Sequence, residues 1–221
     1  DLSVIHENRE APRSFAFPFN DRASAIAGAR VAGHYASPNV LLLNGDWAFA
    51  FAETPDRAPE GFWDERLRPS EGEGWTRIPV PSNIELHGFG FPNYTNIKYH
   101  FTPAEPPLVP ADQNWVGCYR RTFNIPREWS GRELFVRFEG FSSAIEVWVN
   151  GARVGYAEGG RASAEFNITD AARAGPNTIA VKTYRLSDGS YLEDQDFWRL
   201  SGLFRDVMVW AAPPVHVRDF G

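Results

Sequence analysis

The segment from residue 187 to residue 206, SDGSYLEDQDFWRLSGLFRD, combines clustered carboxylates with aromatic side chains. Carboxylates beside aromatic rings suit a ligand that has hydroxyl groups on its edge and C–H groups on its face, as a sugar has. Carboxylates also suit a hard cation, which prefers oxygen ligands. The segment therefore predicts a binding site for a carbohydrate or a cation. Four of its acidic residues, Asp188, Glu193, Asp194 and Asp196, fall close together, and Phe197, Trp198 and Arg199 follow them directly.

The acidic residues of this segment also have structural explanations. Asp188 precedes a glycine, a pair that is typical of a turn. Asp194 and Asp196 are two residues apart and would share one face of an extended segment. The acid and nucleophile of a retaining glycosidase lie about 5 to 5.5 Å apart on different sides of the sugar, so we expect no direct catalysis by this pair. A solvated acidic loop, with Arg199 and Arg205 as counter-charges, is the alternative to ligand or cation binding.

A second candidate is the segment from residue 81 to residue 101, PSNIELHGFGFPNYTNIKYHF, which surrounds asparagines with aromatic rings. The amides of Asn93 and Asn96 can donate and accept at once, which matches a sugar hydroxyl, although asparagine also favours ordinary turns. We expect His87 to be structural, because no second histidine lies at metal-ligand spacing near it. The whole connection between Pro81 and Val116 is long, and such loops tend to be functional or to cover a neighbour.

Several classes of function are excluded or left without support. The net charge of -6 and the absence of a run of Lys and Arg argue against a nucleic-acid surface. The single Cys118 rules out an intrachain disulfide framework, and we expect it to be a buried structural thiol. No apolar stretch approaches the length of a membrane span, and no GxSxG, GxGxxG, Walker or HExxH motif occurs. We find no general acid and base in the chain.

Short stretches with a period of two predict an all-β fold. In LLLNGDWAFAFAE, Trp47, Phe49 and Phe51 alternate with small residues, and Asn150-Gly151 is a strong signal for a hairpin turn. We expect the last strong strand over residues 204–210 and an added edge at Val215 and Val217. Many short strands between turns indicate a β-sandwich or jelly roll in which two sheets share one core. Further strands are expected near residues 75–80, 119–125, 134–138, 145–149 and 179–183.

Residues 1–38 are expected to form an extended N-terminal arm ahead of a sandwich domain over residues 39–221. Three prolines with Asn20 and Asp21 break any long element in the arm. Phe15, Phe17 and Phe19 alternate, so the arm is expected to lay these rings on a surface, either of its own domain or of a neighbouring domain or subunit. The chain opens without Met and stops just past its last expected strand, as an excised domain would.

Several runs resemble the N-terminal region of family 2 glycoside hydrolases, and most of all the large bacterial β-galactosidases. The similarity extends from about Val4 to Gly221. The last run is the longest and is specific to the galactosidase branch rather than to glucuronidases or mannosidases. The runs are LNGDWAF (43–49), VPSNIELHGFGFPNYTN (80–96), VGCYRRTFNIP (116–126), WVNG (148–151) and SDGSYLEDQDFWRLSGLFRDV (187–207).

This resemblance implies a galactose-binding-domain-like jelly-roll sandwich, the sugar-binding domain of a larger hydrolase. In the family, two glutamates of a TIM barrel further along the chain cleave terminal β-galactosides with retention, and that barrel is absent here. The matching positions Asn96 and Asp196 would hydrogen-bond galactose hydroxyls. Asp196 would also ligate a sodium ion whose other ligands come from the barrel and the substrate. The magnesium ligands of the family lie in the barrel, so none falls in this chain.

The leading hypothesis is a non-catalytic domain of a retaining β-galactosidase, although whether the chain alone is an enzyme stays open. Its expected partners are the β-galactoside substrate, the catalytic barrel of the same polypeptide and, in a homo-oligomer, other subunits. We expect a bacterial cytoplasmic protein with neither a nucleic-acid nor a membrane partner. The alternatives are a free-standing carbohydrate-binding module or lectin, and a purely structural interaction domain that works through its phenylalanine-rich arm.

Overall fold

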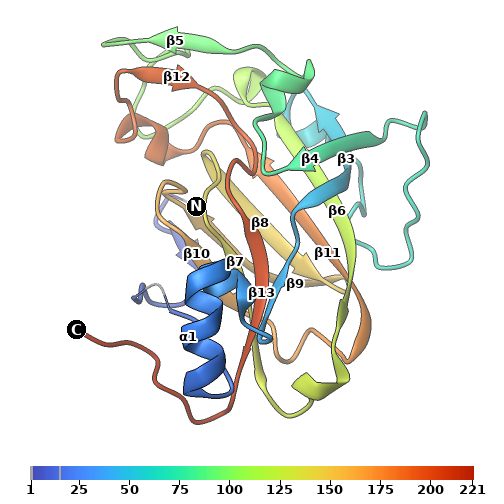
Figure 1. The fold of residues 1–221 in the computed structure, drawn as a ribbon. Coiled ribbons are helices and arrows are strands. Elements are labelled where there is room, and N and C mark those ends of the chain that lie inside the picture. The colour runs from blue at the N-terminus through green and yellow to red at the C-terminus, as the bar shows by residue number, and fades with distance from the viewer. Residues whose placement is uncertain (1, 15) are drawn as a thin grey trace.

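Two antiparallel sheets face each other and form the body of the molecule (Figure 1). The computed structural model describes residues 2–14 and 16–221. The larger sheet has seven strands, each antiparallel to its neighbours. In spatial order they are β1 (His6–Glu7), β9 (Ala152–Glu158), β8 (Ala144–Val149), β11 (Gly175–Tyr184), β6 (Val116–Ile125), β3 (Gly45–Ala52) and β4 (Thr76–Val80).

The second sheet has four strands and covers one face of the first. Its order is β10 (Ala164–Asn167), β7 (Glu133–Phe138), β13 (Val207–Ala212) and β2 (Val40–Leu42). A separate two-stranded ribbon, formed by β5 (Asn93–Thr95) and β12 (Phe197–Arg199), lies at one end of the sandwich (Figure 1). The expected all-β sandwich is confirmed.

The core lies between the two sheets because each strand sends alternate side chains inward. Trp47 and Phe49 of β3 meet Val136 and Phe138 of β7 in one buried cluster, and all four are 0% exposed. Each such side chain contributes about 1.5 to 3 kcal/mol through its removal from water. This shared core stabilises the sandwich that carries the ribbon.

The hairpin between β8 and β9 turns at the expected pair. Asn150 and Gly151 have φ angles of 51° and 84°, which are the left-handed values that such a turn requires. The side chain of Asn150 fixes the turn further, because its Oδ1 accepts a 2.9 Å hydrogen bond from the backbone N–H of Thr178 on β11. The prediction of a hairpin here is confirmed.

The arm contains the one α-helix of the described residues, α1 (Arg22–Val31), so the expectation of an extended segment is wrong there. Asp21 does not break structure but caps the helix: its Oδ1 accepts a 2.8 Å hydrogen bond from the backbone N–H of Ser24. Gly28 faces the ring of Phe19, and a Cβ at this position would come within 2.7 Å of that ring. The helix therefore packs closely on the arm itself.

Phe17 of the arm packs on its own domain. Its ring meets the indole of Trp210 edge to face, with centroids 5.7 Å apart, on the outer side of the four-stranded sheet. Arg13 lies over the same indole at 4.3 Å. Of the two surfaces considered for the alternating rings, Phe17 therefore uses its own domain, whereas Phe15 lies outside the described residues.

Some boundaries differ from those expected. The strand near residue 204 begins only at Val207, since Phe204 stacks under the guanidinium of Arg161 instead. Val215 and Val217 form no strand edge and are exposed. Short 3-10 helices complete the fold: Gly33–Ala36, Pro55–Arg57, Ile84–His87, Ala111–Gln113, Arg127–Trp129 and Asp188–Tyr191. Over the described ranges, no helix combines the length and the apolar character needed to cross a membrane.

Candidate functional site

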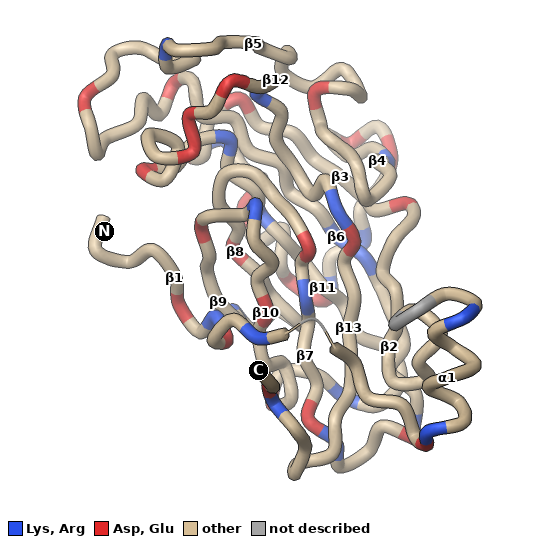
Figure 2. The backbone as a smooth tube through the Cα atoms, turned by 60° about the vertical axis from the view of Figure 1, so that its left-hand side comes forward, with Lys and Arg blue, Asp and Glu red and all other residues tan. Residues whose placement is uncertain are grey.

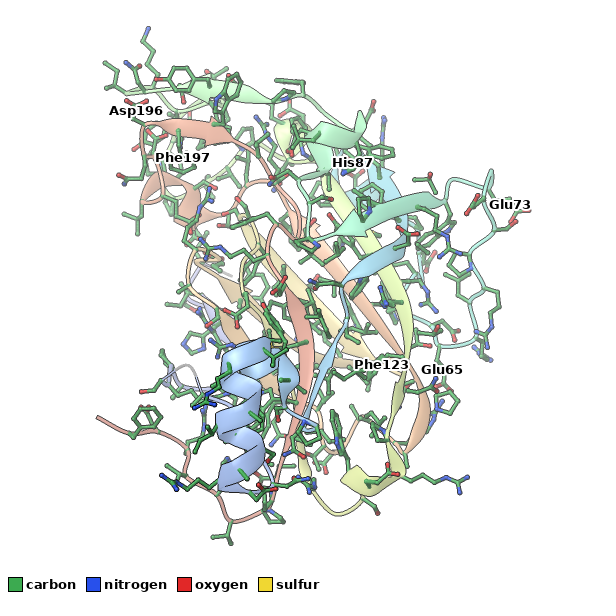
Figure 3. The ribbon with its side chains drawn as sticks, viewed as in Figure 1. Glu65, Glu73, His87, Phe123, Asp196 and Phe197 are labelled. Atoms are coloured by element: carbon green, nitrogen blue, oxygen red, sulfur yellow. The ribbon has the colours of Figure 1, made fainter. Side chains whose placement is uncertain are left out.

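The ribbon brings the two candidate segments together, because β5 comes from the first and β12 from the second. Phe197 pairs with Thr95 and Trp198 with Tyr94 in an antiparallel register. The register ends at Phe197 and Thr95, so Asp196 and Asn96 lie directly beyond the paired ends of the two strands, at the same end of the ribbon. Figure 3 shows Asp196 and Phe197 at one end of the molecule.

The outer face of the ribbon carries Tyr94, Asn96, Asp196 and Trp198, and all four are exposed. The Tyr94 hydroxyl donates a 2.6 Å hydrogen bond to Oδ1 of Asp196. The rings of Tyr94 and Trp198 lie with centroids 5.7 Å apart. The side-chain oxygen of Asn96 accepts from the backbone N–H of Ile97 at 2.9 Å. This face thus offers a carboxylate, an amide and two aromatic rings to a ligand.

The inner face of the ribbon is held by Arg199, which is only 8% exposed. Its Nη2 donates to Oδ1 of Asp194 at 2.5 Å and to the carbonyl of Thr95 at 3.3 Å, and its Nε donates to the Thr95 hydroxyl at 3.3 Å. The same guanidinium lies 4.5 Å from the centroid of the Phe197 ring. Arg199 therefore ties β5 to β12 at the residues that directly precede Asn96 and follow Asp196.

Asp194 and Asp196 do not share a face, which corrects the expectation from their spacing. The backbone N–H of Gln195 bonds to the carbonyl of Glu193, and that of Phe197 to the carbonyl of Gln195, so the chain turns here instead of running straight. Asp194 consequently points inward to its ion pair with Arg199. Asp196 alone faces outward.

A small pocket of about 30 Å³ lies beneath the ribbon, which is room for a water molecule but not for a sugar. His100 lines it, and burial together with the charges of Arg185 and Arg199 lowers the pKa of this imidazole to about 3. Burial raises the pKa values of Glu85 and Glu193 in the same wall. Burial thus opposes the charged form of all three groups.

Three other residues considered from the sequence, His87, Arg205 and Cys118, lie outside the exposed face of the ribbon. His87 is exposed at the end of a 3-10 helix, and Figure 3 shows it well away from Asp196. Arg205 donates to the carbonyls of Glu139 and Arg161, so it is not the counter-charge of the acidic loop. Cys118 is buried, and burial raises the pKa of its thiol to about 12.

Acidic residues gather on and beside β12, as Figure 2 shows, yet they do not form a metal cage. In the part of the chain that the structure describes, no three His, Cys, Asp or Glu residues are grouped so that they could hold a metal ion. Asp196 supplies a single exposed carboxylate. An oxygen-seeking cation bound there would need most of its ligands from elsewhere.

Sequence reasoning found the two segments but missed their pairing. It named Arg199 as a counter-charge of the acidic loop, which the ion pair with Asp194 confirms, but it missed that Arg199 also joins the two segments. It also missed the partly buried His100. The available signal was a period of two in NYTN and DFWR, which is short but places Tyr94, Asn96, Asp196 and Trp198 on one side.

The fold is an antiparallel β-sandwich domain, and the exposed face of its ribbon carries polar and aromatic side chains of the kind that bind ligands. The family model described as "Glycosyl hydrolases family 2, sugar binding domain" matches residues 40–213. The chain belongs to this family and spans its sugar binding domain.

Similar proteins agree with this membership. A β-galactosidase of Priestia megaterium is 41% identical over 220 residues, which is 98% of this chain and 21% of the relative. A β-galactosidase of Yersinia enterocolitica is 45% identical over 185 residues, 83% of this chain and 17% of the relative. The chain thus spans about a fifth of the length of these relatives.

Solved structures show the same fold. A β-glucuronidase of Bacteroides uniformis matches with a TM-score of 0.59 and 24% identity, over 79% of this chain and 18% of that one. A β-glycosidase of Bacteroides vulgatus matches with a TM-score of 0.55 and 25% identity, over 79% of this chain and 20% of that one. These similarities support the sandwich, and the family resemblance of the sequence is confirmed by the family model.

Proposed function

We propose that this chain is the non-catalytic sugar-binding domain of a retaining β-galactosidase and that its ribbon forms part of the pocket for terminal β-galactosides. The observation that carries the proposal is that Asn96 and Asp196 are both exposed and directly adjoin the paired residues Thr95 and Phe197 at one end of the ribbon. The β-galactosidase relatives, at 41% and 45% identity, support the substrate class.

Each polar group has a defined role in this proposal. The Asp196 carboxylate accepts hydrogen bonds from galactose hydroxyls, while the Asn96 amide can donate and accept. The exposed rings of Tyr94 and Trp198 offer flat apolar surface to the C–H face of a sugar. Catalysis falls to a pair of glutamates on a barrel in the rest of the polypeptide, as it does in the family.

A sodium ion is part of the same proposal, with Asp196 as one of its oxygen ligands. This chain contributes one exposed carboxylate to the proposed sodium site, and the Tyr94 hydroxyl already orients it. The remaining ligands would come from the barrel and the substrate, and magnesium would be held by the barrel alone. The proposed setting is a homo-oligomer in a bacterial cytoplasm.

The test is a kinetic comparison in the full-length polypeptide. Asp196→Asn keeps the shape of the side chain but removes the charge, and we expect KM for a β-galactoside to rise at least tenfold and the sodium dependence to weaken. Asp170→Asn is the matched control, because Asp170 is an exposed acid away from the ribbon. Equal kinetics for both variants would refute the role of Asp196.

A further inference from the structure

A second groove, of about 350 Å³, lies against the larger sheet beside the loop of residues 53–75. It is far from the ribbon: Figure 3 places Glu65 and Glu73 of this loop on the side of the molecule opposite to Asp196. Four arginines line it in a chain whose net charge is -6. They are Arg68, Arg77, Arg120 and Arg121.

The strand register explains how two of these arginines come to share a face. Ala48 of β3 pairs with Arg77 of β4 on one side and with Arg120 of β6 on the other. The two arginines therefore flank a small residue at Cα positions about 10 Å apart, which is two strand spacings. The methyl group of Ala48 leaves open space between two long cationic side chains.

The arginines in the groove are poorly neutralised. Arg120 donates to the backbone carbonyls of Phe62 and Leu67, and Arg68 donates to those of Glu65 and Leu67. Among the described residues, neither guanidinium has a carboxylate within ion-pair distance.

The other two arginines are held loosely. Arg77 has only an exposed pair with Glu71, at 3.2 Å. Arg121 reaches the carbonyl of Asp46 at a long 3.4 Å. Burial lowers the pKa of Arg120, and the nearby charge of Arg68 lowers it further, although the carboxylate of Asp64 partly opposes this shift. Holding like charges together in this way is unfavourable unless an anion joins them.

The other groups in the groove suit an oxyanion. Thr122 and Thr178, which are paired directly across β6 and β11, bring two hydroxyl groups to the wall. Guanidinium groups bind phosphate through paired N–H donors, and a tetrahedral group has enough oxygens to serve several of them at once. The exposed carboxylate of Asp46 stands at the rim and opposes an anion.

We propose that this groove binds a phosphate group, either free phosphate or the phosphate of a small molecule, between Arg68, Arg77 and Arg120. Arg120 is fixed by the loop carbonyls and forms the floor, while Arg68 and Arg77 close over the anion. The proposal concerns a face of the larger sheet that the proposed sugar pocket does not use.

The test is titration of the chain with inorganic phosphate at constant ionic strength, followed by calorimetry and by ³¹P line broadening. The double variant Arg68→Ala/Arg77→Ala should weaken binding at least tenfold, and Asp46→Asn should strengthen it. The matched control is Arg57→Ala/Arg66→Ala, which removes two exposed arginines from the same loop. Arg120 is left intact, because its bonds to the loop make it part of the fold.

The outcomes separate cleanly. A loss in the groove variant with unchanged affinity in the control supports the site. Absence of binding by the unmodified chain, or an equal loss in both double variants, would overturn it, as would weaker binding by Asp46→Asn. Where binding occurs, a monosaccharide phosphate that binds tenfold more tightly than inorganic phosphate assigns the site to a phosphorylated small molecule, and equal affinity assigns it to free phosphate.

Discussion

The hydroxyl of Tyr94 donates a 2.6 Å hydrogen bond to Oδ1 of Asp196, although 102 positions separate the two residues in the chain. This bond raises the pKa of the tyrosine, because ionisation would bring two negative charges together. The phenol is therefore a donor at neutral pH and fixes one oxygen of the carboxylate. The other oxygen stays available to a ligand.

Replacing Tyr94 by Phe should show how much the orientation of the Asp196 carboxylate matters, because the variant leaves its charge unchanged. The variant keeps the ring but lets the Asp196 carboxylate rotate, so in the full-length polypeptide we expect KM for a β-galactoside to rise roughly threefold to tenfold with a smaller change in kcat. Tyr99→Phe is the matched control, since it alters another partly exposed tyrosine of the same loop. An unchanged KM for Tyr94→Phe would show that the hydrogen bond does not matter for binding.

Arg199→Ala should loosen the ribbon. It strands the inward-facing Asp194 without its partner, and breaking a buried pair costs about 3 to 5 kcal/mol. Urea unfolding should show this loss, and amide exchange should speed up first at β5 and β12. Arg57→Ala, which breaks an exposed pair with Glu53, should cost at most ~1 kcal/mol. Similar exchange rates at β5 and β12 in both variants would contradict the role of Arg199 in joining these two strands.

Glu158 should make stability fall as pH rises. Burial, opposed by a hydrogen bond from Tyr156 and assisted by the nearby Asp188, raises its pKa from 4.5 to about 7. A raised pKa means that the folded state binds the proton more tightly, so this contribution is full below pH 4.5 and is lost as pH rises through 7. Unfolding of Glu158→Gln between pH 5 and 8 should remove a decline of about 1 to 2 kcal/mol, allowing for solvent screening. If the free energy of unfolding fell equally with pH in the unmodified chain and in Glu158→Gln, this role of Glu158 would be refuted.

His100 should act in the opposite direction. Its pKa is lowered from 6.5 to about 3, so the neutral imidazole favours the fold. That contribution is complete above pH 6.5 and is lost progressively as pH falls toward 3. From pH 7 to pH 5, the unmodified chain should lose about 2 kcal/mol that His100→Asn does not lose. A histidine that titrates near its usual pKa in an NMR titration would contradict this.

The sequence predicted the sandwich because a strand with one face in a core leaves a visible period of two. It did not predict α1, because the helix depends on a local cap at Asp21 and on packing against Phe19, neither of which leaves a long pattern. The ribbon was missed for a related reason. Its strands have three residues each and are stable through a partner far away in the chain.

The site was predictable in part. Asn96 and Asp196 were chosen through family resemblance, and their roles stay predictions, while the pairing of their chain neighbours Thr95 and Phe197 is a finding of the structure. The prediction that Asp194 and Asp196 share a face was wrong, because residues two apart share a face only where the backbone is extended. The backbone turns at Gln195, and the ion pair with Arg199 holds Asp194 inward while Asp196 faces outward.

The start of the arm forms a seam between the two sheets. His6 and Glu7 pair with β9 at the edge of the larger sheet. Arg9 then bridges to Phe166, and the backbone N–H of Glu10 donates to the carbonyl of Glu165, both at the edge of the smaller sheet. Bare strand edges are templates for intermolecular pairing. A few residues of the arm thus cover the edge strands β9 and β10 at once. We expect a chain without these residues to expose both edges and to aggregate.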